Sequence, residues 1–183
     1  MDRRKALILT TSIVGSAIIG SDIFLSGCTP KVKNERIFSD SDIALLDEVG
    51  ETILPETNRS PGAKAANIGL FMTTIVADCY DEKEQTIFKQ GIDELNRTAD
   101  DTYSNSFLEL SKKHKHDLLV KLDNGTRALT DHDTPHFFSM MKQLTIWGFF
   151  TSEPGATKAL RYNPIPGDFK GCIPYNKGDK AWA

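Results

Sequence analysis

Hydrophobic residues recur at helical spacing along most of the chain after residue 38. Ser39 followed by Asp42 has the pattern of a capping box, in which each side chain bonds the other residue's backbone N–H at the start of a helix. Behind this pair, apolar residues follow every three or four positions as far as Ile53 and predict a helix that ends near Pro55. The same spacing predicts further helices over residues 63–80, 82–98 and 114–122, a short segment that opens at Phe107, and a last helix whose first position is Pro135.

The C-terminal third has a different pattern. Prolines and glycines recur from Pro164 onward and exclude a long helix or a central strand. Apolar residues nevertheless continue there, at Ile165, Phe169, Ile173 and Tyr175. We therefore expect an extended segment that lies either against the chain's own helices or against a partner protein. Because no clear run of period-two alternation indicates a strand, the sequence predicts an all-α fold, a small helical domain with an extended, Pro/Gly-rich C-terminal segment.

Composition and charge exclude several classes of function. The 183 residues have a formal net charge of -3, whereas a nucleic-acid-binding protein needs a basic face to neutralise phosphates. The sequence contains no GxGxxG, no GxxxxGKS or GxxxxGKT and no CxxCH, so it shows neither a nucleotide-binding loop nor a c-type haem attachment site. We expect no nucleic-acid partner and no cofactor bound by this chain.

The first 27 residues are predicted to be a signal peptide. The cationic start Arg3-Arg4-Lys5 precedes a nearly uncharged apolar stretch. This stretch ends in Leu25-Ser26-Gly27-Cys28, which resembles the bacterial lipobox. Cys28 is therefore expected to be the lipidated mature N-terminus, anchored in a membrane on the periplasmic side of the cell envelope. A plain transmembrane anchor is the alternative, and the paired arginines leave both Sec and twin-arginine export open.

The predicted lipidation divides the rest of the chain. Residues 28–38 are expected to form a polar tether, and residues 39–183 the helical domain. Two thiols remain after Cys28 is modified, those of Cys79 and Cys172. An even pair in an oxidising envelope compartment is a candidate disulfide, which would pin the C-terminal segment to the second predicted helix. Two free, buried thiols are the alternative.

Histidines offer little sign of a metal site. His132 and His136 are four residues apart, a spacing that can hold a metal on a helix. Pro135 lies between them, however, and we interpret the segment as a solvated capping turn. His114 and His116 stand among lysines, which disfavours a cation. The sequence therefore predicts no metal site.

No catalytic set can be assembled from the charged residues of the motifs. Glu56, Asp78, Glu153 and Arg161 lack an accompanying nucleophile, base and orienting group. We expect Glu153 to cap a short helix and Arg161 to pair with Glu153 or Glu56. The alternative is that these residues contact a partner.

Several short runs together resemble the signature of the gluconate 2-dehydrogenase subunit 3 family. They are ILPET (53–57), SPGA (60–63), DCY (78–80), FTSEPGA (150–156), LRY (160–162), PIPG (164–167) and GCIP (171–174). The resemblance extends over residues 40–175, nearly the whole mature chain. Members of this family commonly bear a twin-arginine leader, which favours that export route here.

The resemblance implies a non-catalytic small subunit of an envelope dehydrogenase for sugars, polyols or gluconate. A large flavoprotein subunit of the glucose-methanol-choline type would bind FAD and oxidise the substrate, and a cytochrome c subunit often carries the electrons onward. The small subunit is expected to escort the large one through maturation and export. The residues of the matching runs that we expect to contact the partner are Thr151, Glu153, Gly155, Arg161, Tyr162, Pro164 and Gly167.

The expected docking surface combines the segment 147–175 with the loop from Pro55 to Ala63. The segment is rich in aromatic residues and contains Arg161, and such residues are enriched where interfaces carry their energy. The alternative function is a free-standing envelope lipoprotein that binds a sugar or another envelope protein and does no redox work.

Overall fold

A computed structural model describes residues 37–127, 135–165, 167–168 and 171–182. The predicted signal peptide, the lipidation site Cys28 and the paired arginines Arg3 and Arg4 lie outside the described residues, and so does His132. These features stay predictions of the sequence.

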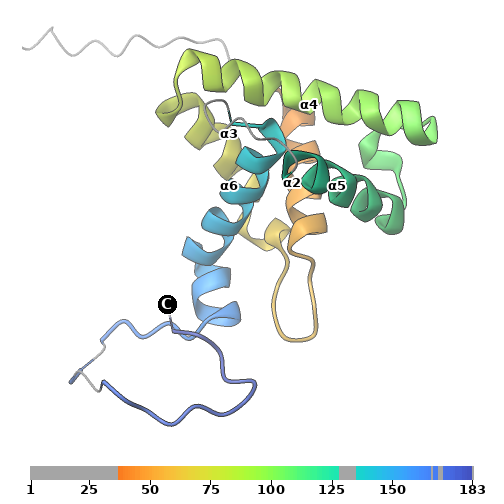
Figure 1. Ribbon diagram of the computed structural model, residues 1–183. Helices are drawn as coiled ribbons and strands as arrows, with labels where there is room; N and C mark the ends of the chain where they lie inside the picture. Colours follow the sequence, from red (N-terminus) through yellow and green to blue (C-terminus); the bar gives the residue numbers. More distant parts are fainter. Residues whose placement is uncertain (1–36, 128–134, 166, 169–170, 183) are drawn as a thin grey trace, which may run out of the picture. The chain divides into compact units, whose positions relative to one another are not determined.

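Helices make up the described domain, and the prediction of an all-α fold is confirmed (Figure 1). In the described parts of residues 37–182 the structure contains no β-strand, and β-type pairing is limited to isolated bridges at Thr57–Ser60 and Arg161–Trp182. In none of these parts is a helix both long and apolar enough to cross a membrane. The α-helices are α2 (Asp40–Ile53), α3 (Ile68–Cys79), α4 (Glu82–Tyr103), α5 (Lys112–Arg127) and α6 (Phe137–Thr151), joined by the short elements η2 (Ala63–Ala66), η3 (Phe107–Glu109) and η4 (Gly155–Ala159).

The capping box predicted at the start of α2 is present. The Asp42 N–H donates to Ser39 Oγ at 3.2 Å, and the Ser39 N–H donates to Asp42 Oδ2 at 2.8 Å. Lys89 of α4 also bonds Asp42 Oδ2, at 2.5 Å. Burial alone would raise the pKa of Asp42, but the hydrogen bonds from Lys89 and Ser39 outweigh it and hold this pKa below its ordinary value.

The domain begins before the predicted boundary at Ser39. Phe38, which the sequence places in the tether, is buried and packs edge-to-face on Phe88 of α4, with 5.9 Å between the ring centroids. Apolar residues that precede a helix cap commonly pack against the fold and set the direction of the entering chain. Phe38 therefore belongs to the core.

The helix predicted over residues 63–80 is interrupted. After η2, Asn67 adopts a left-handed conformation with φ of 50°, and α3 begins at Ile68. The break lets the start of α3 dock on α2, where the Gly69 N–H donates to Asp47 Oδ1 at 2.7 Å. A Cβ on Gly69 would lie 2.3 Å from the Ile43 carbonyl oxygen. Such a close approach between two helices is not visible in local periodicity.

The other helices begin or end away from their predicted bounds. α4 and α5 are both longer than predicted, and α6 begins at Phe137 rather than at Pro135. His136 is the N-cap of α6, because its Nδ1 accepts a hydrogen bond from the Phe138 N–H at 3.1 Å. Pro135 therefore precedes the cap instead of occupying the first helical position.

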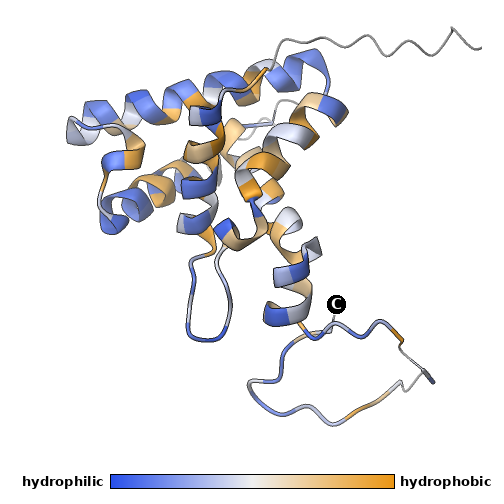
Figure 2. Ribbon diagram, turned by 180° about the vertical axis from the view of Figure 1, so that it is seen from behind, coloured by the Kyte–Doolittle hydropathy of each residue, from blue (hydrophilic) through white to orange (hydrophobic). Residues whose placement is uncertain are grey.

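The core lies between α2, α3, α4 and α6, with α5 packed against α2 and α6. Figure 2 shows these helices with hydrophobic and hydrophilic residues on different sides, the pattern expected of amphipathic helices around one core. The largest of the fully buried side chains are Phe88, Phe107, Phe138, Phe149, Leu46, Ile68 and Met72.

Candidate partner-binding surface

The chain turns sharply after α6. The Gly155 N–H donates to Ser152 Oγ at 3.3 Å, and the Leu160 N–H donates to the Gly155 carbonyl oxygen at 2.9 Å across the π-type turn η4. A Cβ on Gly155 would lie 1.8 Å from the Phe149 carbonyl oxygen, which is backbone and has little freedom to move. Gly155, a predicted partner-binding residue, is buried and therefore shapes the turn itself.

We call residues 161–182 the C-terminal loop, and its described residues extend away from the end of α6 (Figure 1). Their described apolar side chains are exposed: the exposed fraction is 82% for Ile165, 76% for Tyr175, 54% for Tyr162 and 49% for Ile173. Of the two expectations for this segment, packing against the chain's own helices is not what the structure shows. Apolar groups gathered on one exposed segment are typical of an interaction site.

The other predicted partner-binding residues lie along the same continuous stretch. Thr151 ends α6 and donates through Oγ1 to the Trp147 carbonyl oxygen at 2.8 Å. Arg161 does not pair with Glu153 or Glu56, and its guanidinium instead lies over the Trp182 ring, 4.8 Å from the centroid. The members of the set with exposed side chains or backbone are Thr151, Glu153, Arg161, Tyr162, Pro164 and Gly167.

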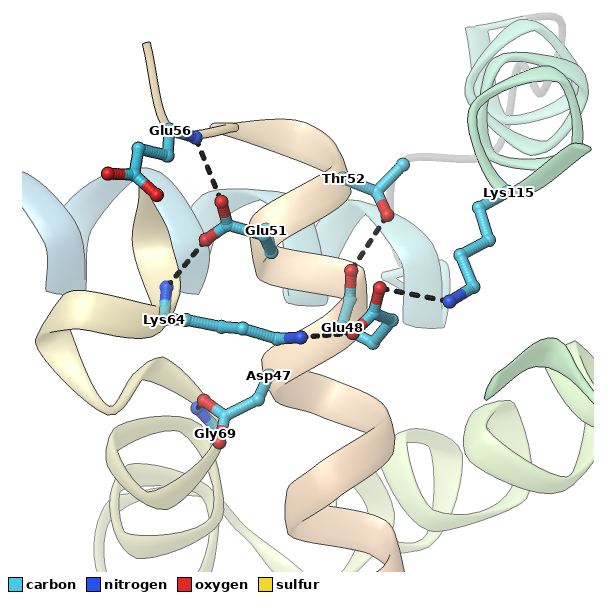
Figure 3. Close-up of polar contacts among 8 residues, drawn as sticks. All are labelled: Asp47, Glu48, Glu51, Thr52, Glu56, Lys64, Gly69 and Lys115. Carbon is cyan, nitrogen blue, oxygen red and sulfur yellow. Dashed lines mark hydrogen bonds and ion pairs between the residues drawn. The ribbon is translucent and has the colours of Figure 1, made fainter. Parts of the chain in front are cut away.

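A second loop, residues 55–62, follows α2 and is exposed over residues 55–59. Glu51 holds both of its ends: the Glu56 N–H donates to Glu51 Oε1 at 2.8 Å, and the Lys64 N–H donates to Oε2 at 3.0 Å (Figure 3). The Thr57 N–H also donates to the Ser60 carbonyl oxygen at 2.9 Å. The loop therefore has a defined conformation, and it would lose little conformational entropy if it bound a partner.

Two further acids of α2 fix the elements around this loop. Glu48 forms ion pairs with Lys64 and, at 2.9 Å, with the buried Lys115 of α5 (Figure 3). Burial alone would raise the pKa of Glu48, but hydrogen bonds from the two lysines outweigh it, so this pKa lies below its ordinary value. Asp47 holds the start of α3, as described above.

Sequence reasoning missed Asp47, Glu48, Glu51 and Lys115. The available signal is that the three acids lie within one and a half turns of helix, directly before a loop that the motifs single out. Nothing in the sequence indicates their partners, which lie up to 67 positions away.

A cleft of about 480 Å³ lies between the end of α2, the 55–62 loop and the start of α5. Its lining is largely polar, and its two α2 acids, Glu48 and Glu51, are already engaged by lysines and backbone N–H groups. In the described parts of the chain, no three His, Cys, Asp or Glu side chains group as metal ligands would.

The two thiols predicted to form a disulfide are free and exposed. Cys79 ends α3 beside the start of α4, at the other end of the helices from the C-terminal loop that contains Cys172 (Figure 1). The structure thus does not show the bond, and the pairing stays a prediction. It does not show the alternative of buried thiols either.

Comparison with known proteins places these features in a family. A family model described as gluconate 2-dehydrogenase subunit 3 matches residues 40–167. The match runs from α2 through the 55–62 loop to the first part of the C-terminal loop. No curated protein and no solved structure matches the chain.

Proposed function

The chain belongs to the gluconate 2-dehydrogenase subunit 3 family, and we propose that it is the non-catalytic small subunit of an FAD-dependent sugar, polyol or gluconate dehydrogenase in the bacterial cell envelope. Its partner is a large flavoprotein subunit of the glucose-methanol-choline type, which holds FAD and oxidises the substrate. A cytochrome c subunit is the proposed electron acceptor within the same assembly.

The exposure of the C-terminal loop is the observation that supports this proposal best. Tyr162, Ile165 and Tyr175 are mostly exposed although they are apolar or aromatic, and Arg161 lies among them. Tyr, Trp and Arg are the residues most enriched in the parts of interfaces that carry binding energy. A subunit that binds a larger protein has a use for such a loop, whereas a free-standing protein would be expected to cover it.

The proposed role extends to export and anchoring. The predicted leader and lipobox end at Cys28. A flavoprotein without a signal of its own would bind this subunit in the cytoplasm, with FAD inside, and be exported in its folded state by means of this leader. Lipidation of Cys28 would then hold the assembly at the membrane on the periplasmic side. Several acyl chains bind a membrane stably, whereas one chain binds marginally.

Co-purification tests the proposal. The tagged chain is produced together with the flavoprotein encoded beside it, and the flavin absorbance of the eluate is measured. We expect flavin to elute in proportion to the tagged chain. Elution without flavin or flavoprotein, although both are present in the extract, would contradict the proposal and favour a free-standing lipoprotein.

Single substitutions locate the contact. Tyr162→Ala and Tyr175→Ala should each reduce flavoprotein retention by roughly fivefold or more, since truncation of an aromatic anchor costs on the order of 1 kcal/mol or more. Leu108→Ala is the matched control, because Leu108 is an exposed apolar residue of η3, outside the proposed surface. It should leave retention unchanged.

A further inference from the structure

The two ends of the C-terminal loop are joined. The Arg161 N–H donates to the Ala181 carbonyl oxygen at 2.8 Å, and the Arg161 guanidinium lies over the Trp182 ring at 4.8 Å from its centroid. The Lys180 ammonium also donates to the Lys158 carbonyl oxygen at the end of η4. We call these contacts between residues 158–161 and 180–182 the neck of the loop. They close residues 161–182 into a loop of 22 residues.

Turns inside the loop lie on both of its described arms, the first arm being residues 161–165 and the second residues 171–182. On the first arm, the Ile165 N–H donates to Asn163 Oδ1 at 3.2 Å. On the second arm, Asn176 and Asp179 bond each other twice, at 3.0 Å in both cases, around Gly178. Gly178 has φ of 100°, which favours glycine strongly. Among the described residues, the hydrogen bonds of the loop lie at the neck and at these turns, so its arms present unpaired backbone groups as well as apolar side chains.

We propose that the Arg161–Trp182 neck is a positioning device that holds the C-terminal loop closed, so that both arms enter one groove of the large dehydrogenase subunit together. This rests on the proposed function and assigns a role to Trp182 and to the residues after 175. Closing the loop in advance lowers the conformational entropy lost on binding, since an open 22-residue segment would have to be ordered at that moment.

The chemistry of the loop favours a protein groove with an acidic rim. The loop carries four basic and two acidic residues, for a net charge of +2, within a chain whose net charge is -3. A protein groove can supply hydrogen bonds to the unpaired backbone of extended, proline-containing arms. The hydrocarbon of a membrane supplies none. A membrane surface is the other occupant that the test below distinguishes.

A double-mutant cycle separates positioning from direct contact. Arg161→Ala and Trp182→Ala are compared, singly and together, for their affinity to the purified large subunit. If the two residues act by closing the neck, each single variant should lose about fivefold and the double variant no more than the larger single loss. Losses that multiply in the double variant would overturn the proposal, because each residue would then contact the partner independently.

Proteolysis of the isolated subunit provides a second readout. Trp182→Ala should be cut by trypsin within residues 161–182 several-fold faster than the wild type, since an open loop is more accessible. Trp182→Phe keeps a ring face for the guanidinium and should restore most of both the resistance and the affinity. Unchanged cleavage in Trp182→Ala would overturn the claim that Trp182 keeps the loop closed. Faster cleavage with unchanged affinity would overturn the role of the neck in docking.

Failure of the proposed function is distinguishable from these outcomes. If the wild-type chain itself does not retain the large subunit, the proposed function fails before the neck is tested. Sedimentation with phosphatidylglycerol vesicles, carried out in a Cys28→Ala background that lacks the lipid anchor, tests a membrane as the occupant. Loss of vesicle binding in Trp182→Ala with flavoprotein binding intact would overturn the proposal in favour of a membrane-binding loop.

Discussion

Through His136, at the start of α6, the stability of the fold is expected to depend on pH. His136 Nδ1 accepts the hydrogen bond that caps the helix, and burial lowers its pKa from the ordinary value of 6.5, although Glu94 opposes this. The unfolded chain therefore binds more protons between the lowered pKa and 6.5. Stability should be complete above pH 6.5 and fall as the pH drops through this window. The denaturant midpoint at pH 7.5 and at pH 5.5 measures the effect.

His136→Asn is the matched control, because asparagine is a preferred N-cap that does not titrate. The variant should keep most of the stability at pH 7.5 and lose less of it at pH 5.5 than the wild type. Equal losses in the two proteins would show that another group causes the pH dependence. His136→Ala, which removes the cap altogether, should cost about 1 kcal/mol at pH 7.5 and less at pH 5.5, where protonation of His136 already weakens the cap of the wild type.

Substitution of two glycines, one with no room for a Cβ and one with open space around it, tests the packing of the turn after α6. Gly155→Ala places a Cβ against the Phe149 backbone oxygen and should lower the free energy of unfolding by about 1–3 kcal/mol, because the backbone must shift. Gly125 has no neighbouring atom within 4 Å of an added Cβ and lies in α5. Gly125→Ala should therefore raise stability by up to about 1 kcal/mol. Similar values for the two variants would contradict the proposed packing of the turn.

At the scale of elements, Glu51 determines the conformation of the 55–62 loop. Glu51→Gln keeps one acceptor oxygen and presents an NH₂ group to the other backbone N–H, so one of the two hydrogen bonds is lost. We expect faster hydrogen exchange at the Glu56 and Lys64 amides and a loss of about 1 kcal/mol in stability. Exchange measured by NMR or mass spectrometry reports on both amides.

Glu56→Gln removes the same charge from an exposed side chain of this loop. It should change stability by less than about 0.5 kcal/mol and leave the exchange of the Lys64 amide as in the wild type. If the two variants loosen the loop equally, charge rather than the hydrogen bonds of Glu51 is responsible.

At the scale of the whole molecule, the proposed anchor depends on one thiol. Cys28→Ala should block lipidation, so that the protein remains as precursor or appears in the soluble fraction. Fractionation followed by mass spectrometry of the mature N-terminus measures both. A mature N-terminus at any residue other than Cys28 would refute the lipoprotein prediction.

The second whole-molecule prediction concerns Cys79 and Cys172. A disulfide between them would close more than ninety residues and stabilise the fold by on the order of 4 kcal/mol in the chain-entropy model. It would also require the C-terminal loop, which extends away from the end of α6 (Figure 1), to come to the end of α3 at Cys79. Alkylation under denaturing, non-reducing conditions tests the bond. If no cysteine is alkylated, the result supports the bond, and if both Cys79 and Cys172 are alkylated, it contradicts the bond.

The sequence by itself determined the class of fold, the family and the surface of interest. The capping box of Ser39 and Asp42 and the apolar spacing as far as Ile53 act within one helix, so the chain's local order suffices to read them. The short runs around the two loops identify the family for the same reason. Several of these runs lie in the C-terminal loop, whose described apolar residues are exposed.

Tertiary structure alone decided which residues hold these loops in place. Asn67 breaks a helix because Gly69 docks on α2, and Phe38 joins the core because Phe88 lies opposite. Glu48 meets Lys115 across 67 positions. Ion pairs and close approaches between helices depend on which elements pack together, and periodicity along one element carries no information about its neighbour. For this reason the sequence indicated where the chain could bind a partner, and only the fold showed how that surface is shaped.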